Sequence, residues 1–292
     1  MKVGFVAILG RPNVGKSTLL NALLSKKISI VSPRAQTTRD SILGIYNDSK
    51  RQIVFVDTPG IFQGEVKMDR YMKKAAYEST RDVNVIVYII DASTKLLDAD
   101  FAAIKAINSD TPIIFVLNKI DLINLAKAIE LKAAIKEKYP DNLILEASFL
   151  ENFGIKEIKE AIEPYLEEGN PFYGEEFITD KDMSFQAKEI IREKLLHFLK
   201  QEIPHQSAVK IESLTKKNGG YWIKAKLIVN KDSHKGIVIG RGGEMIKKIS
   251  MASRHELERM WHEHITNLEI EVEAIPSWRD NPKVLAELGY AD

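Results

Sequence analysis

The sequence has no cysteine, no apolar run of membrane-spanning length and almost no net charge. Without cysteine among its 292 residues, the chain forms no disulfide bond, thiolate zinc site or cysteine nucleophile, which is typical of a reducing cytoplasm. Its most apolar window, Val83 to Ile90, is shorter than the roughly 18 residues of a transmembrane helix. The apolar opening Val3 to Leu9 lacks a basic start and a cleavage site, so we expect no signal peptide and a cytoplasmic location.

The composition of 45% hydrophobic and 28% charged residues is that of an ordinary globular protein, which excludes a disordered chain and a membrane bundle. The net charge of +1 hides an uneven distribution. Between Lys210 and Lys248 there are ten Lys or Arg and three Asp or Glu residues. Such a cluster indicates an anion-binding surface or a solvated face, and charge alone does not choose between them.

The first 170 residues alternate short apolar runs with longer amphipathic ones. This alternation predicts an α/β domain with a mainly parallel sheet and helices on both faces. Ligands of such sheets bind at the carboxyl ends of the strands. The expected strands are Val3–Leu9, Gln52–Asp57, Val83–Asp91, Pro112–Leu117 and Asn142–Ala147. The expected helices are Ser17–Leu24, Val66–Arg81, Ala99–Asn108, Leu125–Tyr139 and Ile155–Leu166.

Residues 171–183 show no sustained period and are interpreted as a linker between a domain at 1–170 and one at 184–292. The second domain is expected to be a smaller α+β domain, because a helix precedes two strands joined by an Asn-Gly-Gly hairpin signal. A glycine loop, a long helix and a last strand follow. The expected elements are a helix at Ser184–Lys200, strands at Ala208–Leu214 and Tyr221–Val229, an apolar run at Gly236–Ile239, a helix at Met245–Ile265 and a strand at Leu268–Ile275.

A glycine loop directly follows the first expected strand and opens the first helix, and it matches the phosphate-binding pattern GxxxxGKS/T. Glycines there let backbone N–H groups turn toward phosphates at the positive end of a helix. Lys16 is expected to reach the β and γ phosphates, and Ser17 to bind Mg²⁺. The loop residues expected to contact the nucleotide are Gly10, Arg11, Pro12, Asn13, Val14, Gly15, Lys16, Ser17 and Thr18.

Two further segments end apolar strands. Asp57, Thr58, Pro59 and Gly60 form a DTPG sequence, in which Asp57 is expected to be the second magnesium-site carboxylate and Gly60 to approach the γ-phosphate. Alone, this sequence could be a simple β-turn. The second segment, NKID at 118–121, contains a carboxylate that can accept from both donors of guanine. Adenine offers no such donor pair and would leave Asp121 unpaired, so the segment predicts guanine selection.

With these segments in order, the sequence resembles the translation-factor-like branch of small GTPases and, within it, the Era family of bacterial ribosome-assembly GTPases. The resemblance covers nearly the whole chain and rests on GRPNVGKS (10–17), QTTRD (36–40), DTPG (57–60) and NKID (118–121). It implies that Thr38 closes on Mg²⁺ and the γ-phosphate, so that the metal ligands are Ser17, Thr38 and Asp57. It also places Ala147, Ser148 and Phe149 at the guanine base and Asn118, Lys119 and Asp121 around it. Phe149 departs from the small Ala usual in the family.

The expected cofactors are GTP or GDP with Mg²⁺. The residue after DTPG is Ile61, whereas Ras-type GTPases carry Gln there to orient the attacking water. The sequence therefore predicts slow intrinsic hydrolysis, with Lys16, Thr38, Gly60 and Asn13 as the catalytic candidates. In related GTPases an Asn at the position of Asn13 helps to hold a K⁺ ion that replaces an arginine finger. Arg39 either supplies positive charge or lies in solvent.

The second domain resembles a KH domain of type II, which clamps RNA backbone with a GxxG loop. The GxxG pattern is weak alone, but it is supported here by the order of elements, the basic flank and the apolar wall Ile237–Ile239. Gly242 stands where the family often has Lys. Tyr221 and Trp222 could stack bases, but the core is the more frequent place for such residues on a strand. The expected RNA-binding residues are Lys235, Gly240, Arg241, Gly242, Gly243, Lys247 and Lys248.

The resemblance implies binding to the 3′ end of 16S ribosomal RNA and a role in small (30S) subunit assembly. The leading interpretation is a switch that hydrolyses GTP and controls an RNA-binding domain. The alternative is a constitutive RNA-binding assembly factor in which GTP is a structural ligand. We expect a monomer without zinc, since the six histidines lack ligand spacing, and weak peripheral contact with the inner face of the cell membrane.

Overall fold

The computed structural model describes residues 1–32, 34, 37–60, 66–94, 97–107, 110–217 and 219–290. The chain divides into two compact units, residues 1–63 with 72–180 and residues 64–71 with 181–292. The main division thus falls inside the predicted linker. That residues 64–71 cluster with the second unit is not apparent from the sequence.

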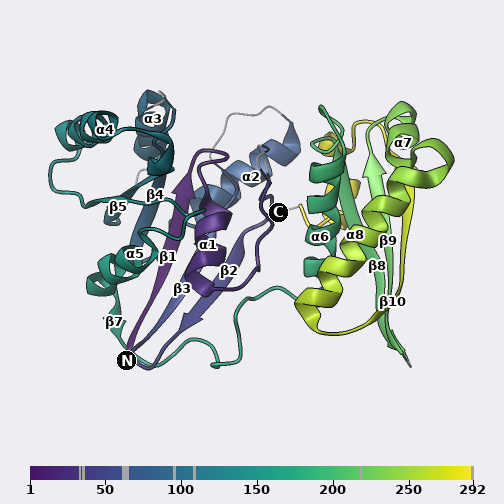
Figure 1. Ribbon diagram of the computed structural model, residues 1–292, viewed down its shortest axis with the longest axis horizontal. Helices are drawn as coiled ribbons and strands as arrows, with labels where there is room; N and C mark the ends of the chain where they lie inside the picture. The colour runs from purple at the N-terminus through teal and green to yellow at the C-terminus, as the bar shows by residue number, and fades with distance from the viewer. Residues whose placement is uncertain are drawn as a thin grey trace. The chain divides into compact units, whose positions relative to one another are not determined.

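The first unit is built on a twisted sheet in the order β2-β3-β1-β4-β5-β6, with β7 paired to β1 (Figure 1). The neighbours from β3 to β6 are parallel, whereas β2 and β7 pair antiparallel. The predicted mainly parallel sheet is therefore confirmed. The strands are β1 (Lys2–Gly10), β2 (Ile42–Asn47), β3 (Arg51–Asp57), β4 (Val85–Asp91), β5 (Ile113–Asn118), β6 (Ile144–Glu146) and β7 (Glu167–Glu168).

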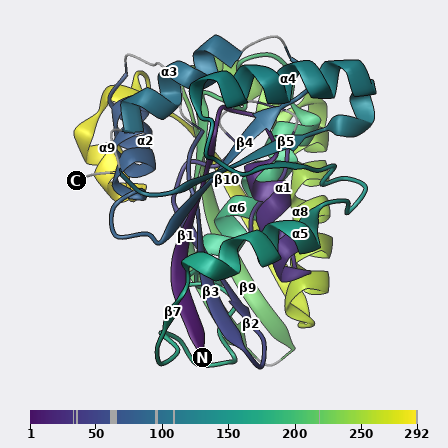
Figure 2. The same ribbon diagram turned by 90° about the vertical axis from the view of Figure 1, so that its left-hand side faces the viewer.

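Helices cover both faces of this sheet (Figure 2). One hydrophobic layer joins the sheet to α1 and α5, and the opposite layer joins it to α3 and α4. This arrangement explains why the strands are near-continuous apolar runs, since a parallel sheet buries both of its faces. The helices are α1 (Lys16–Leu24), α2 (Lys67–Glu78), α3 (Leu97–Ile107), α4 (Leu125–Lys138) and α5 (Ile155–Ile162), with short 3₁₀ turns at Ile120–Leu122 and Glu163–Tyr165.

The chain that leaves α5 runs along the sheet before it enters the second unit. Gln52 of β3 is fully buried. Its side-chain oxygen accepts from the backbone N–H groups of Phe172 (2.6 Å) and Tyr173 (3.0 Å), and its amide donates to the Tyr173 carbonyl at 2.8 Å. Further along, the Ile45 N–H of β2 donates to the Ile178 carbonyl at 2.9 Å. Much of the predicted linker is thus hydrogen-bonded to the first unit, although its sequence shows no period.

The second unit is an α+β domain with a three-stranded sheet in the order β10-β9-β8, in which β8 and β9 are antiparallel and β9 and β10 parallel. Two helices, α6 and α8, pack together and against this sheet (Figure 1). The elements are α6 (Met183–Phe198), β8 (Ser207–Lys217), β9 (Gly220–Val229), α7 (Asp232–Ile239), α8 (Glu244–Trp261), β10 (Ile265–Ala274) and α9 (Pro282–Glu287), with 3₁₀ turns at Arg241–Gly243 and Trp278–Asp280.

One prediction in this unit is wrong, and one helix was missed. The long helix ends at Trp261, not at Ile265, because His262 takes a left-handed φ of 52° and stops the helix. Ile265 is buried as its helical spacing suggested, but it begins β10. The apolar run Gly236–Ile239 is the last turn of a helix that the sequence analysis did not predict. The hairpin is confirmed by the pairing of Lys217 with Gly220, while Asn218 at its tip lies outside the described residues.

The buried amide of Gln52 generates the first prediction. Replacing Gln52 with Leu leaves backbone groups of Phe172 and Tyr173 without their partner, at a cost of about 1–3 kcal/mol for each buried group. We expect the free energy of unfolding of the first unit to fall by about 2–3 kcal/mol in urea melts followed by circular dichroism. Asn47→Ala removes one of the four hydrogen bonds to the Gln52 side chain. The free energy of unfolding should therefore fall less in this control variant. An unchanged urea midpoint in Gln52→Leu would contradict the account.

Candidate nucleotide site and nucleic-acid interface

The phosphate-loop sequence lies between β1 and α1, at the carboxyl end of the central strand. Gly10 and Gly15 have φ angles of 147° and 109°, which L side chains rarely adopt. A Cβ on Gly15 would lie 2.5 Å from the Asn118 side-chain nitrogen. Glycine is therefore required here both by backbone conformation and by close approach. The loop presents its N–H groups at the helix start, where an anion binds favourably.

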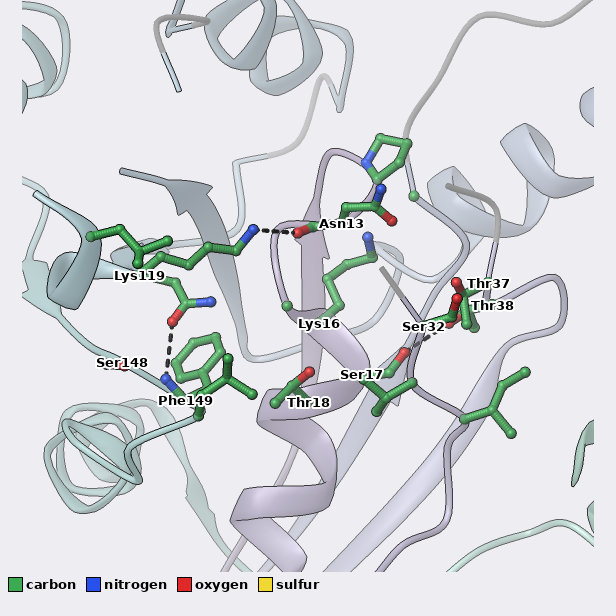
Figure 3. A pocket seen from close by; sticks show the side chains of 18 of the residues that line it. Asn13, Lys16, Ser17, Thr18, Ser32, Thr37, Thr38, Lys119, Ser148 and Phe149 are labelled. Carbon is green, nitrogen blue, oxygen red and sulfur yellow. Dashed lines mark hydrogen bonds between the residues drawn. The ribbon is translucent and has the colours of Figure 1, made fainter. Parts of the chain in front are cut away.

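The Ser17, Thr38 and Asp57 side chains, predicted from three distant segments, lie together. The Ser17 hydroxyl lies 2.8 Å from the Thr38 hydroxyl (Figure 3). It donates to Asp57 Oδ2 at 2.8 Å. A fourth side chain, Ser29, also donates to Asp57 Oδ2, at 3.0 Å. Sequence reasoning missed Ser29, because no motif precedes it. Three oxygen ligands from the phosphate loop, the following loop and the end of β3 thus converge on one point.

This cluster fits a hard divalent cation. Asp57 is fully buried, and its Oδ1 atom has no hydrogen-bond partner. Burial raises the pKa of Asp57, opposed by the positive charge of Lys16. A cation would give the orphaned oxygen a partner and favour the ionised carboxylate. Oxygen ligands of this type suit Mg²⁺, which keeps several waters and shares phosphate oxygens.

The Lys16 side chain is hydrogen-bonded to the backbone of the phosphate loop. Its ammonium donates to the carbonyls of Gly10 (3.2 Å) and Arg11 (3.0 Å). Burial lowers the pKa of Lys16 to about 8, while Asp57 acts in the opposite direction. The ammonium is therefore desolvated and lies where phosphates would supply the missing counter-charge. Contact of Lys16 with the β and γ phosphates stays a prediction.

Asn118 joins the phosphate loop to the segment at 147–149. Its amide donates to the Val14 carbonyl at 2.7 Å, and its oxygen accepts from the Phe149 N–H at 3.1 Å. Lys119 extends over the phosphate loop, where it donates to the Asn13 carbonyl at 3.0 Å and pairs with Asp91 at 2.6 Å (Figure 3). Asp91 was not predicted, although it ends β4 as Asp57 ends β3. These bonds join the phosphate loop to the segments that contain Lys119 and Phe149.

A cavity of about 450 Å³ lies between these segments. Asp121 is exposed at its edge and, among the described residues, has no partner. Thirteen of the predicted residues line the cavity, namely Pro12, Asn13, Gly15, Lys16, Ser17, Thr18, Thr38, Gly60, Asn118, Lys119, Asp121, Ser148 and Phe149. Those outside its lining are Gly10, Arg11, Val14, Asp57, Thr58, Pro59 and Ala147.

Phe149 is accommodated where a smaller residue was expected. Its side chain is 3% exposed and belongs to the hydrophobic layer under α1. A Cβ on Gly15 would lie 3.0 Å from the ring, so the ring packs directly beneath the phosphate loop. The neighbouring Ser148 hydroxyl is buried without a partner. Backbone contacts from this segment to the base stay a prediction.

The sequence analysis left two alternatives for Arg39. Arg39 does not lie in solvent, since it is 1% exposed; that alternative is wrong. Ile61 and Gln36, which the sequence analysis also singled out, lie outside the described residues. Gly60 lies against the phosphate loop, because a Cβ there would be 2.9 Å from the Pro12 nitrogen.

Arg11 turns away from the cavity toward α3. Its guanidinium lies 3.6 Å from the carboxylate of Asp100, which is 2% exposed and also accepts from the Tyr88 hydroxyl at 3.3 Å. Burial raises the pKa of Asp100 to about 6, although Arg11 opposes the shift. Asp100 was not predicted, because an acid in a helical pattern is usually solvated. The pair links the phosphate loop to α3.

In the second unit, the GxxG loop connects α7 to α8. Gly240, Gly242 and Gly243 have φ angles of 76°, 60° and 82°. A Cβ added to Gly242 or Gly243 would meet nothing within 4 Å, so the backbone of a ligand can approach the loop closely. Ile237, one of the three residues of the predicted apolar wall, is 52% exposed beside it, whereas Val238 is buried in the core.

The basic segment Lys210–Lys248 divides into two parts. On the sheet, Lys210 pairs with Glu287, and Lys224 and Lys226 pair with Glu212. Around the GxxG loop no carboxylate partner occurs in the described part of the chain for four basic residues. These are Lys235, Arg241, Lys247 and Lys248. The excess positive charge therefore gathers at the glycine loop, as a phosphate-binding surface requires.

The fold and the site define the class of protein: a P-loop GTPase domain followed by a KH domain. Family models agree. Residues 5–119 match a "50S ribosome-binding GTPase" family, and residues 202–276 match the KH domain.

Curated relatives extend over both domains. The chain is 41% identical to GTPase Era of Thermoanaerobacter sp. (strain X514) over 293 residues, covering 99% of this chain and 97% of the relative. It is also 41% identical to GTPase Era of Clostridium acetobutylicum over 290 residues, covering 99% and 98%. The chain belongs to the Era family, and it is a GTPase.

Solved structures agree over the full length. A variant of Aquifex aeolicus Era bound to GDP and AlF₄⁻ has a TM-score of 0.94 at 38% identity, with 100% of both chains covered. An Era in complex with MgGDPNP and nucleotides 1506–1542 of 16S ribosomal RNA has a TM-score of 0.93 at 38% identity, also with 100% of both chains covered. Among the described residues, no helix is long and apolar enough to cross a membrane.

The buried Asp100 gives a prediction with a defined sign. A carboxyl whose folded pKa is raised from 3.8 to about 6 contributes stability that is present below its unfolded pKa and is lost as the pH rises through about 6. Asp100→Asn removes this dependence. We expect the stability of the wild type relative to Asp100→Asn to improve by about 1 kcal/mol between pH 7.5 and pH 5. Parallel thermal and urea melts measure the difference, and equal pH slopes would contradict the assignment.

Proposed function

We propose that this GTPase is a switch in which Mg²⁺ and GTP order the loop that contains Thr38, and in which hydrolysis releases it. The observation that carries the proposal is the convergence of Ser17, Thr38 and Asp57, with an orphaned oxygen on Asp57. Mg²⁺ held there would neutralise charge on the β and γ phosphates. Because the Thr38 hydroxyl is hydrogen-bonded to the Ser17 hydroxyl, a change at the γ-phosphate would directly affect the loop that contains Thr38.

For hydrolysis, Lys16, Thr38, Gly60 and Asn13 are the residues of this chain that we propose to act on the γ-phosphate. Lys16 supplies charge and Gly60 a backbone N–H, while Asn13 would help to hold K⁺ in place of an arginine finger. With isoleucine at position 61, the chain has no side chain there to orient water. Intrinsic turnover is therefore expected to be slow and faster in K⁺ than in Na⁺.

For the second domain, we propose binding to the 3′ end of 16S ribosomal RNA and assistance in assembly of the small (30S) subunit. The support is the open backbone at the GxxG loop and the uncompensated charge of Arg241, Lys235, Lys247 and Lys248. A loop of this kind holds about four backbone nucleotides of single-stranded RNA. A related Era bound to such an RNA, described above, supports the choice of target. A monomer in the cytoplasm, with peripheral membrane contact, stays a prediction.

The switch is tested by the affinity for a labelled RNA from the 16S 3′ end with a non-hydrolysable GTP analogue, with GDP and without nucleotide. All measurements use one salt concentration, because salt alone changes such affinities strongly. We expect a preference of at least tenfold between nucleotide states, about 1.4 kcal/mol of coupling. An ATP analogue is the control and should have no effect, since adenine leaves Asp121 unpaired. Equal affinity in all states would favour the alternative, a constitutive RNA-binding factor with GTP as a structural ligand.

A further inference from the structure

Two adjacent aromatic residues of β9 point to opposite faces of the second sheet, as alternation on a strand requires. Tyr221 faces the helices, where its ring meets Trp261 edge-on with centroids 5.6 Å apart. Trp222 faces away from the helices and is 40% exposed. The two residues, equivalent in sequence analysis, therefore have different roles. Only Tyr221 is partly buried against the helices.

The outer face of the sheet is covered at one end and open at the other. Ile228 shares the face of Trp222 but is only 4% exposed. At this end the C-terminal segment approaches the sheet, since Lys210 of β8 donates to Glu287 of α9 at 2.8 Å. Trp222 lies toward the other end of β9, next to the β8–β9 hairpin. The exposed indole thus lies beyond the part that the C-terminus protects.

The surroundings of Trp222 favour an anionic, aromatic ligand. The Lys217 ammonium lies over its ring at 4.6 Å from the centroid, and within the described residues it has no carboxylate partner. Thr215 and Asn267 are in register with Trp222 on the neighbouring strands and add polar groups to the same face. We call this group (Thr215, Lys217, Trp222 and Asn267) the Trp222 face; Lys224, which follows on the same side of β9, is already paired with Glu212. Glu269, in register with Lys224, bounds it with a negative charge.

We infer that the Trp222 face is a second RNA-binding site, on which Trp222 stacks a nucleobase while Lys217 contacts a phosphate. The inference rests on the proposed function. A GxxG loop holds about four nucleotides, so most of a longer RNA must lie elsewhere. From Trp222 to Val229, β9 spans about 23 Å at 3.3 Å per residue, and the GxxG loop follows only after α7. One RNA can therefore contact both sites only if it is longer than the stretch of nucleotides that the GxxG loop holds.

Charge decides for RNA over an apolar protein partner. The cation over the ring would repel a cationic peptide and would remain unpaired under an apolar one, whereas a nucleotide supplies both a π-face for the indole and a phosphate for Lys217. Stacking on an exposed aromatic side chain tolerates any base. The site is thus expected to add affinity and to add little sequence preference.

The test compares two RNAs on the full-length protein with a GTP analogue: a five-nucleotide single strand and the 37-nucleotide segment corresponding to 1506–1542. We expect Trp222→Ala to weaken binding of the long RNA about tenfold and to leave the affinity for the short RNA unchanged. Trp222→Phe keeps a stacking ring and should bind the long RNA within about threefold of wild type. Lys217→Ala should reduce the salt dependence of long-RNA binding by about one phosphate contact. Met251→Ala, at an exposed residue of α8 (52% exposed), is the matched control.

Tryptophan emission gives a second readout, because all three tryptophans lie in the second unit and Trp278 is fully buried. Long RNA should quench emission in the wild type and much less in Trp222→Phe. Unchanged long-RNA affinity in Trp222→Ala, or equal losses in Trp222→Phe and Trp222→Ala, would overturn the inference. Arg241→Ala separates it from the proposed function. Loss of both RNAs in that variant supports the GxxG site, whereas failure of both RNAs to bind the wild type would reject the proposed function itself.

Discussion

The site depends on one buried carboxylate. Asp57 receives hydrogen bonds from Ser17 and Ser29, and its charge is balanced by Lys16 in the phosphate loop. A desolvated carboxylate is costly unless it is paired or bound to a metal, and here one of its oxygens is still without a partner. The same carboxylate thus fixes the position of the loop, the end of β3 and the hydroxyl of Thr38 through Ser17. In the proposed switch, nucleotide binding would be coupled to the loop that contains Thr38 through this one group.

Several parts of this arrangement follow from the sequence. Strands buried on both faces are apolar throughout, and the glycine loop, DTPG and NKID sequences each follow such a strand, so their meeting at one edge was predictable. The strand β2 was missed, because Ile42–Asn47 is a short run interrupted by Gly44 at the edge of the sheet, and no motif marks it. The end of α8 was misplaced, since Ile265 continues the helical spacing while the backbone of His262 stops the helix. Burial of Arg39 and the roles of Ser29, Asp91 and Asp100 depend on tertiary packing that no local pattern encodes.

The second domain shows why a charge count is a weak guide. Its basic segment contains lysines that pair with carboxylates across the sheet and basic residues that pair with none among the described residues. Four of the second group surround the GxxG loop, where the backbone is open, and Lys217 lies beside Trp222. The same distinction separates Tyr221 from Trp222: one is packed against Trp261, whereas the other is exposed beneath an unpaired ammonium. In both cases the proposed RNA-binding surface consists of exposed groups that no carboxylate neutralises among the described residues.

The most direct measurement of the central claim is the effect of Mg²⁺ on binding of a non-hydrolysable GTP analogue, measured by calorimetry for the wild type and for Asp57→Asn. If the orphaned oxygen of Asp57 serves the metal, Mg²⁺ should strengthen binding at least tenfold in the wild type, about 1.4 kcal/mol, and far less in the variant. Ser29→Ala, which keeps the carboxylate, should retain the effect. Binding of GDP without Mg²⁺ verifies that each variant is folded. An equal gain from Mg²⁺ in Asp57→Asn would contradict the account.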